Sequence, residues 1–472
     1  MRGHAGARGE DLIHAAPLPH SLTARLDRLP ATRTVWRIIA LLSLALFFEL
    51  YDMLMTGVIA PGLTASGILT VTTPGLFGAA GIASFVAALF AGLTVGTVSA
   101  GLFTDRFGRR AIFTWAMLGY TLFSIAMAFQ STAWGLNSCR FLAGIGLGIE
   151  LVTIDIYISE LVPKHVRGRA FAFSQTCGFT AVPIVGILAW ALVPRAPLGL
   201  EGWRWVVLIG ASSALAAWYI RRRLPESPRW LMQVGRHREA EDVISQLERK
   251  VRTEYGAALP EPVENETPAR PSRFAEIWTP PYRGRAIMMA IFNIAQSIGF
   301  YGFTNWVPTL LISRGVGTTH SLLYTAIIAI AAPVGPLLGV KIGDRLERKW
   351  LICGAAGTAA GCGLLFGQAT VAIALIILGV LITVANNTMS FAYHAYQAEL
   401  FPTRLRAKAV GCVYSFSRAS AAVNAFLIAL VLRNFGAAGV FAFIGGAMLI
   451  VVITIGGFGP RTTGQALEEI SR

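Results

Sequence analysis

Residues 105–110 read Asp-Arg-Phe-Gly-Arg-Arg, and residues 344–349 read Asp-Arg-Leu-Glu-Arg-Lys. A second motif is repeated too, as Glu-Leu-Val-Pro at 160–163 and Glu-Leu-Phe-Pro at 399–402. The separation is 239 residues in both pairs, from 105 to 344 and from 160 to 399. Two independent motifs rarely share one offset by chance. The chain therefore contains two copies of one structural unit.

The composition predicts a membrane protein. Of the 472 residues, 54% are hydrophobic and only 14% are charged, where a soluble protein carries about 25%. Twelve apolar runs are long enough to cross a bilayer as helices, and they are too long and too uniformly apolar for the strands of a membrane barrel. The runs lie at roughly 36–60, 75–103, 111–130, 134–157, 170–193, 203–221, 285–312, 321–343, 350–368, 370–396, 408–432 and 437–459. We therefore predict an all-α membrane protein with twelve transmembrane helices in two six-helix bundles.

The basic residues predict the orientation of these helices. The net charge is +15, but the positive charges are not spread over one surface. If both termini are cytoplasmic, the cytoplasmic segments hold 34 of the 40 Lys and Arg residues. Such a bias is the usual topology signal of membrane proteins, so it argues against a nucleic-acid partner. The first 35 residues contain no apolar stretch, which predicts a cytoplasmic tail rather than a cleaved signal peptide.

The same pattern divides the chain into segments. Helical spacing of apolar residues at 236–252 predicts an amphipathic helix in the central loop, and the Pro- and Glu-rich stretch 260–271 predicts a linker. The five cysteines lack zinc or redox spacing, and no nucleotide-binding loop occurs, so we expect no metal or cofactor. The predicted segments are a tail at 1–35, a six-helix bundle at 36–221, a cytoplasmic loop at 222–284, a second bundle at 285–460 and a tail at 461–472.

Four motifs carry a family resemblance. They are Gly101-x-x-x-Asp105-Arg106-x-Gly108-Arg109-Arg110, Arg140-x-x-x-Gly144-x-Gly146-x-Gly148, Pro225-Glu226-Ser227-Pro228-Arg229-Trp230-Leu231, and Pro460-Arg461-Thr462-Thr463-Gly464. With them the chain resembles transporters of the major facilitator superfamily, in its sugar-porter and organic-ion (metabolite:proton symporter) branches. The resemblance implies a secondary transporter rather than an enzyme. It also implies a monomer in a bacterial inner membrane that binds small solutes and protons.

The resemblance implies a gating role for the repeated charged motifs. Their carboxylates and guanidinium groups can form bidentate ion pairs that hold helix ends together and separate when the inner side opens. The second copy departs from the pattern, because Val340 stands where glycine is expected and Glu347 replaces the inner glycine. The alternative is that these basic loops only set topology. The predicted gating residues are Asp105, Arg109, Glu160, Arg167, Asp344, Arg348, Glu399 and Arg406.

Charges inside apolar spans are costly and are read first as functional groups. Glu49 and Asp52 are three apart on the first span, so they share a helix face. The motif Tyr51-Asp52 and the position of Arg140, 20 residues before Glu160, resemble proton-coupled sugar porters. The resemblance implies that Asp52 and Arg140 switch a proton, together with Glu49. The alternatives are a static buried pair for Asp52 and Arg140 and, for Glu49 and Glu150, a structural ion pair with a cation inside one bundle.

The remaining polar residues in the spans are candidates for substrate binding. Gln175 and Gln296 stand where the resemblance puts substrate glutamines, whereas Tyr301 and His394 replace an asparagine and a tryptophan. His394 is also the repeat mate of Asp155, again 239 residues apart. The predicted substrate site comprises Gln175, Gln296, Tyr301, His394, Arg418 and Asn387.

Arginine binds carboxylates through a planar fork, and histidine changes charge between about pH 5 and 8. We therefore predict proton-coupled symport of a small organic acid anion by alternating access, with Arg418 and His394 as anion-binding groups. A neutral sugar or polyol, an organic cation held by Glu49 and Asp52, and drug–proton efflux remain open as alternatives. The repeated cytoplasmic motifs argue against a channel, and the absence of a catalytic motif argues against a membrane enzyme. A solute-sensing receptor on the same scaffold stays open as a further class.

Overall fold

The computed structural model describes residues 22–70, 72–75, 80–262, 274–342 and 346–462. Its regular elements within these ranges are helices. Asp344, the predicted linker except its first residues, and most of both predicted tails lie outside the described residues. The helices are α1 (Leu22–Asp27), α2 (Arg33–Ala65), α3 (Ile82–Phe107), α4 (Arg109–Ala128), α5 (Ala133–Leu161), α6 (Lys164–Phe179), α7 (Ala181–Leu192), η2 (Pro197–Gly199), α8 (Gly202–Gly210), α9 (Ser213–Arg223), α10 (Pro228–Gln233), α11 (His237–Tyr255), η3 (Phe274–Trp278), α12 (Tyr282–Thr304), α13 (Val307–Ser313), α14 (Thr318–Ile330), α15 (Val334–Ile342), α16 (Arg348–Gln368), α17 (Ala372–Glu399) and α18 (Thr403–Phe458).

The prediction of an all-α membrane protein is confirmed. Eleven helical segments of the described chain are long and apolar enough to cross a membrane. The last of them, in α18, covers two of the twelve predicted runs. Gly436 separates these two runs with a φ of 65° and a ψ of −170°, a conformation that glycine adopts without the steric cost of a side chain. The chain therefore reverses inside α18 and crosses twice.

Four spans consist of two helices each, and proline explains three of the breaks, the exception being that between α8 and α9. Pro183, Pro308 and Pro333 lie at or just after the junctions α6/α7, α12/α13 and α14/α15. Proline lacks the N–H that an α-helix needs in its interior and clashes with the preceding turn. Each break exposes backbone groups within the bundle, so these spans can bend where they contact their neighbours.

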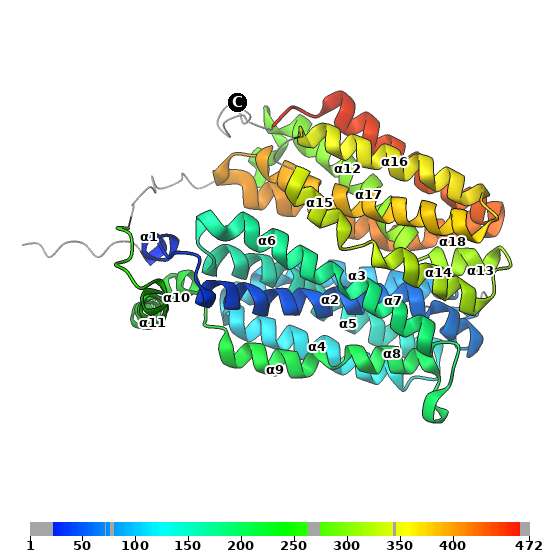
Figure 1. Cartoon of the computed structure of the whole chain (residues 1–472), viewed down its shortest axis with the longest axis horizontal. Coiled ribbons are helices and arrows are strands. Elements are labelled where there is room, and N and C mark those ends of the chain that lie inside the picture. Colours follow the sequence, from blue (N-terminus) through cyan, green and yellow to red (C-terminus); the bar gives the residue numbers. More distant parts are fainter. Residues whose placement is uncertain (1–21, 71, 76–79, 263–273, 343–345, 463–472) are drawn as a thin grey trace, which may run out of the picture.

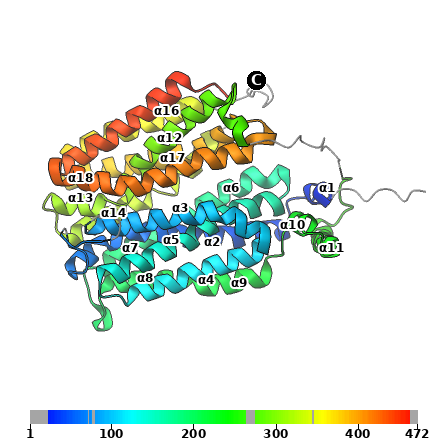
Figure 2. The same cartoon turned by 180° about the vertical axis from the view of Figure 1, so that it is seen from behind.

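The helices form two bundles that lie against each other (Figure 1). Helices α2–α9 make the amino-terminal bundle and α12–α18 the carboxy-terminal bundle, and the view from behind shows the same division (Figure 2). Helices α1, α10 and α11 lie at one end of the molecule, which we call the terminal end because the first described helix, α1, lies there; the opposite end is the far end.

Large apolar side chains point outward along both bundles. Leu122, Leu215, Ile373 and Ile453 are each more than half exposed. Such a surface would be unfavourable in water, and it matches a bilayer.

Small residues let the helices of the amino-terminal bundle approach closely. A Cβ atom on Gly92 would lie 2.1 Å from the backbone oxygen of Phe141, and one on Gly96 would lie 2.1 Å from that of Ile145. Only glycine permits such contact between α3 and α5, as is common between membrane helices. This packing fixes α5, which carries Arg140, Glu150 and Asp155.

The two bundles also meet closely at the far end. A Cβ atom on Gly57 of α2 would lie 2.5 Å from the backbone oxygen of Asn305, at the end of α12. Gly186 of α7 packs on the backbone of Ala326 in α14. These contacts hold the far-end halves of both bundles against each other.

Candidate functional site

A cavity of about 70 Å³ lies between the two bundles. The amino-terminal bundle contributes acidic, amide and apolar side chains, and the carboxy-terminal bundle contributes aromatic and basic ones. The lining residues are Leu46, Glu49, Leu50, Met53, Leu151, Asp155, Gln175, Phe179, Gln296, Phe300, Tyr301, Ser390, Tyr393, His394, Tyr414, Ser417 and Arg418. We call this cavity the central cavity.

The structure brings most of the predicted substrate residues together here. Five of the six line the central cavity: Gln175, Gln296, Tyr301, His394 and Arg418. Asn387 does not. It lines a second cavity of about 50 Å³, which is mainly apolar and shares only Phe179 and Phe300 with the first.

Sequence reasoning missed two aromatic residues of the central cavity. Tyr393 and Tyr414 are tyrosines within apolar spans, where membrane proteins often carry aromatic side chains as packing residues. A signal for Tyr414 was available, because it is four residues before Arg418 and therefore on the same helix face. Tyr393 carried no such signal, since it only neighbours His394 in the chain.

Arg418 is the cation of the central cavity. Its Nη1 donates a hydrogen bond to the hydroxyl of Tyr301 and its Nη2 donates one to the hydroxyl of Tyr414, each at 2.5 Å. Its Nε is buried and has no hydrogen-bond partner in the described part of the chain. No described carboxylate lies within 4.0 Å of the guanidinium, so its charge is not neutralised by an ion pair. A buried arginine in this state favours an anionic ligand.

Aromatic rings surround the guanidinium. Arg418 lies 4.9 Å from the ring centroid of Tyr414. His394 stacks on Tyr393, with ring centroids 4.2 Å apart and planes 28° apart. The rings leave flat apolar surface beside the charge, which suits a planar organic anion better than a bulky hydrated ion.

The amino-terminal bundle supplies the opposite charge. Glu49 is 1% exposed, and neither of its carboxylate oxygens has a hydrogen-bond partner among the described residues. Asp155 is exposed and lines the central cavity. The charge of Arg418 acts on both carboxyl groups across the cavity. The bundles therefore face each other with opposite charges.

Neither Glu49 nor Glu150 forms a structural ion pair with a described cation, the alternative that the sequence left open. Both oxygens of each side chain lack a partner in the described chain, and no described cation lies within 4.0 Å of either group. Arg140, the arginine on the same helix as Glu150, pairs with Asp52 instead.

Asp52 and Arg140 form a buried ion pair inside the amino-terminal bundle. Asp52 accepts a second hydrogen bond from the hydroxyl of Ser124 at 2.7 Å. Arg140 also donates to the backbone oxygen of Asp52 at 2.7 Å and to the hydroxyl of Thr56. Phe85 closes one side, with Arg140 5.5 Å from its ring centroid. Neither Asp52 nor Arg140 lines a cavity, so protein separates this ion pair from the central cavity.

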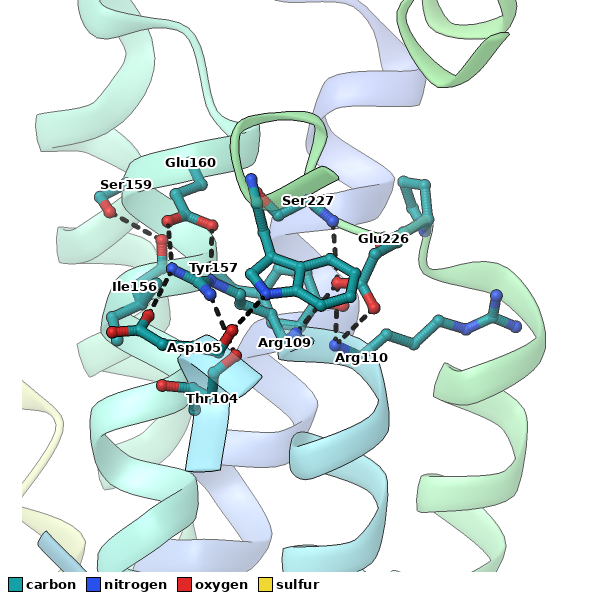
Figure 3. A network of polar contacts seen from close by, with 12 residues as sticks. Thr104, Asp105, Arg109, Arg110, Ile156, Tyr157, Ser159, Glu160, Glu226 and Ser227 are labelled. Atoms are coloured by element: carbon teal, nitrogen blue, oxygen red, sulfur yellow. Dashed lines mark hydrogen bonds and ion pairs between the residues drawn. The ribbon is translucent and has the colours of Figure 1, made fainter. Parts of the chain in front are cut away.

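At the terminal end, the first charged motif forms a dense network (Figure 3). Arg109 donates to both oxygens of Glu160, each at 3.2 Å, and to the backbone oxygen of Thr104 at 3.0 Å. Asp105 lies 3.1 Å from the same guanidinium. These contacts join the adjoining ends of α3 and α4 to the end of α5.

The segment before α10 completes this network. Glu226 accepts hydrogen bonds from the backbone N–H groups of Arg109 and Arg110, the first residues of α4. The indole of Trp230 donates to the backbone oxygen of Asp105 at 2.9 Å. A carboxylate at a helix N-terminus stabilises that end, although burial raises the pKa of Glu226.

The other predicted gating residues have more varied positions. Arg348 and Glu399 form an ion pair that links α16 to α17. Arg167 donates to the backbone oxygen of Val162 at 3.2 Å and lies 3.9 Å from Asp27 of α1. The side chain of Arg406 lies outside the part that the structure describes, as Asp344 does. Both described pairs, Arg109–Glu160 and Arg348–Glu399, join helices within one bundle rather than across the two.

Comparisons with known proteins agree with this geometry. The profile described as "Sugar (and other) transporter" matches residues 35–472. The chain is 32% identical to the putative metabolite transport protein YyaJ of Bacillus subtilis (strain 168), over 94% of this chain and 96% of that protein. It is 26% identical to the niacin transporter NiaP of Acinetobacter baylyi, over 95% of this chain and 99% of that protein.

Solved structures share the fold. A partially occluded inward-open conformation of the xylose transporter XylE from E. coli matches with a TM-score of 0.72, at 20% identity, over 92% of this chain and 99% of that one. A structure described as a D-xylose-proton symporter matches with a TM-score of 0.69, at 19% identity, with the same coverage.

Proposed function

The chain belongs to the sugar (and other) transporter family of the major facilitator superfamily, and on this premise we propose that it is a proton-coupled symporter of a small organic acid anion. It is a multi-pass metabolite transporter of a bacterial inner membrane and not an enzyme. The proposal adds the substrate class, the coupling ion and a monomeric working unit in the lipid bilayer.

The observation that carries the substrate class is the state of Arg418. The residue is 3% exposed and lines the central cavity, and its guanidinium has no carboxylate within ion-pair distance in the described chain. A substrate carboxylate can accept the free Nε–H and replace one tyrosine hydroxyl as a partner of the guanidinium. The low dielectric of an apolar cavity strengthens this attraction. The name of the niacin transporter supports the same class, since niacin is an aromatic carboxylic acid.

Asp52 and Arg140 support proton coupling. While they are paired, the carboxylate stays ionised because a guanidinium neutralises it. A rearrangement that separates them leaves a carboxylate in a medium where its charge is costly, so it takes up a proton. Neutralised Asp52 then permits a different arrangement of α2 and α5. The names of the xylose–proton symporters support this mechanism for a chain of the same fold.

Alternating access follows from the two ends of the molecule. The far end is held by Gly57 against Asn305 and by Gly186 against Ala326. At the terminal end, the described ion pairs of the charged motifs remain within each bundle. We infer an inward-facing state with the terminal end in the cytoplasm. Rocking of the bundles about the substrate would open the far end instead.

A thermal-shift panel on the purified full chain tests the substrate class. The panel contains nicotinate, benzoate, succinate, xylose and choline, at pH 6 and pH 8. Stabilisation by one of the carboxylates in the wild type, lost in Arg418→Gln, supports the proposal. Stabilisation by xylose alone or choline alone contradicts it.

A neutral sugar is the second candidate. Gln175 and Gln296 both line the central cavity and can hydrogen-bond hydroxyl groups. Under this alternative Arg418 serves only to position Tyr301 and Tyr414 through its hydrogen bonds. The alternative predicts that Gln296→Ala weakens the binding of xylose and that no carboxylate competes with it.

A further inference from the structure

Glu150 is a buried acid that neither the substrate site nor the Asp52–Arg140 pair uses. It lies in the middle of α5, and it is 0% exposed. Neither carboxylate oxygen has a hydrogen-bond partner in the part of the chain that the structure describes. An ionised carboxylate without partners is very unfavourable inside a membrane protein. The side chain therefore holds a proton in this state.

The packing of α4 on α5 places a polar row beside Glu150. Gly146, one helical turn before Glu150, packs against Tyr120, because a Cβ atom there would lie 3.0 Å from the Cβ of that tyrosine. Residues four apart share a helix face, so Glu150 lies on the face of α5 that packs against α4. Ser124, one turn after Tyr120, donates its hydroxyl to Asp52 at 2.7 Å. The face of α4 that carries Tyr120 and Ser124 thus extends from the neighbourhood of Glu150 to Asp52.

Tyr120 adds a group that can exchange a proton. Its hydroxyl is buried and makes no hydrogen bond within 3.5 Å among the described residues, with the hydroxyl of Ser213 as its polar neighbour. The charges of Glu150, Asp52 and Glu49 all act on it. A hydroxyl can donate and accept hydrogen bonds at once, so it can join two carboxyl groups directly or through a water molecule.

Proton coupling needs a path that the Asp52–Arg140 pair does not itself provide. Asp52 lines neither cavity, while Glu49 lines the central cavity one helical turn away. The charges of Glu49 and Asp52 both act on Glu150. Glu150 is therefore within electrostatic reach of the acid that meets the cavity and of the acid that lies closed inside the bundle.

We propose that Glu150 relays protons between Glu49 at the central cavity and Asp52 in the closed interior. The inference rests on the proposed proton-coupled function. Glu150 gives its proton to the Asp52 carboxylate, which forms an O–H bond there and breaks the ion pair with Arg140. Glu150 then takes a proton from Glu49, which is reprotonated from water in the cavity. One proton moves at each step, and the relay ends as it began, with Glu150 protonated.

The step also keeps the number of buried charges constant. Before transfer, Asp52 is the anion beside Arg140; after transfer, Glu150 is the anion until Glu49 reprotonates it. Tyr120 can stabilise this anion by turning its hydroxyl toward it. The intermediate is short-lived because nothing in the described interior neutralises it fully.

Infrared spectroscopy of the reconstituted full chain tests the proposal without a substrate. The protonated carboxyl C=O band at neutral pH should lose one component in Glu150→Gln, which matches the side chain in size. The band that appears when the pH drops, and is absent in Asp52→Asn, reports protonation of Asp52. In Glu150→Gln this band should appear about a hundredfold more slowly, the low end of what a positioned proton-transfer group contributes. Glu150→Asp should restore part of the rate.

Three outcomes separate the claims. A Glu150→Gln variant with an unchanged rate of Asp52 protonation overturns the relay and leaves the proposed function standing. A band that never appears in the wild type, even in acid, overturns both, because Asp52 then takes up no proton. Loss of the Glu150 component with a slowed Asp52 band supports the relay, and Asp242→Asn, at an exposed position of α11, should change neither.

Discussion

Arg140 and Asp52 lie 88 positions apart in the chain and form an ion pair in the interior of the amino-terminal bundle. The side chain of Arg140 is fully buried and that of Asp52 is 5% exposed. Such a pair is a poor source of stability, because removing two charges from water costs about as much as their attraction returns. Its value lies in having two states, paired and ionised or separated and protonated.

Replacing Asp52 by asparagine should separate exchange from accumulation. Asparagine can still accept from Arg140 through its oxygen and can donate its amide N–H to the hydroxyl of Ser124, but it cannot take up or release a proton at any working pH. We expect counterflow of labelled nicotinate to continue while accumulation driven by a pH gradient falls to the level of protein-free vesicles. Gradient-driven accumulation in Asp52→Asn would exclude Asp52 as the coupling residue. Ser124→Ala is the matched control, since it removes one hydrogen bond and leaves the carboxyl group.

Removing the cavity cation should weaken anion binding. A hydrogen bond to a charged group contributes about 1.5–3 kcal/mol, which is about 10- to 150-fold in Kd. We expect Arg418→Gln to raise the Kd of nicotinate by this factor and Arg418→Lys to raise it less, because the charge remains. His394→Ala should have a smaller effect, since His394 stacks on Tyr393 rather than ion-pairing. Isothermal titration calorimetry gives these constants, and an unchanged Kd in Arg418→Gln would remove that residue from the site.

A larger side chain at Gly57 should open the far end. A Cβ atom there would lie 2.5 Å from the backbone of Asn305, so a leucine cannot coexist with the contact seen here. We expect Gly57→Leu to shift the population toward states with separated far-end halves. Gly119→Leu is the control, because a Cβ atom at Gly119 meets no other atom within 4 Å.

Spin-label distances measure this shift. Labels at Leu198 and Val371, both well exposed, report on the far ends of the two bundles once the five native cysteines are replaced by serine. The distance distribution should lengthen in Gly57→Leu and not in Gly119→Leu. Identical distributions in the two variants would mean that the Gly57–Asn305 contact does not hold the far end closed.

The docking of α1 on α11 should depend on pH only in acid. Partial burial raises the pKa of Glu248, but the hydrogen bonds from Arg25 and Arg28 outweigh it and hold that pKa below its usual value. A lowered pKa in the folded state gives stability that is present above the ordinary glutamate range and is lost as the pH falls through the folded pKa. The protection of the α1 amides, taken relative to the intrinsic exchange rate at each pH, should therefore be steady from about pH 8 to 5 and fall below the ordinary glutamate pKa of about 4.3.

The variant Glu248→Gln makes this test specific. It should accelerate exchange in α1 at neutral pH, and added salt should do so in the wild type, because both arginines are partly exposed. Exchange in α1 that is the same in Glu248→Gln and wild type would show that other contacts, such as that between Asp27 and Lys164, hold the helix.

The sequence predicted the fold well because repeated motifs and long apolar runs are local signals. It also predicted, from the family resemblance, that Asp52 meets Arg140. It identified His394 as the repeat mate of Asp155, and the structure places both on the central cavity. The sequence did not predict that Asn387 lies in a different cavity from the other substrate residues. The cavity that a side chain lines depends on its height along the bundle and on the packing of neighbouring helices. The sequence also could not predict the hydrogen bonds of Arg418 to two tyrosines, because aromatic residues in membrane spans are mostly packing residues.

The central claim is that protons and an organic anion cross together. A pH electrode in weakly buffered medium outside proteoliposomes of the full chain measures it directly when nicotinate, benzoate or xylose is added without an imposed gradient. The account predicts that a carboxylate makes the external medium more alkaline than in protein-free vesicles, that Asp52→Asn and Arg418→Gln abolish this excess, and that xylose has no effect. Alkalinisation by xylose and not by either carboxylate, or acidification by a carboxylate, would contradict it.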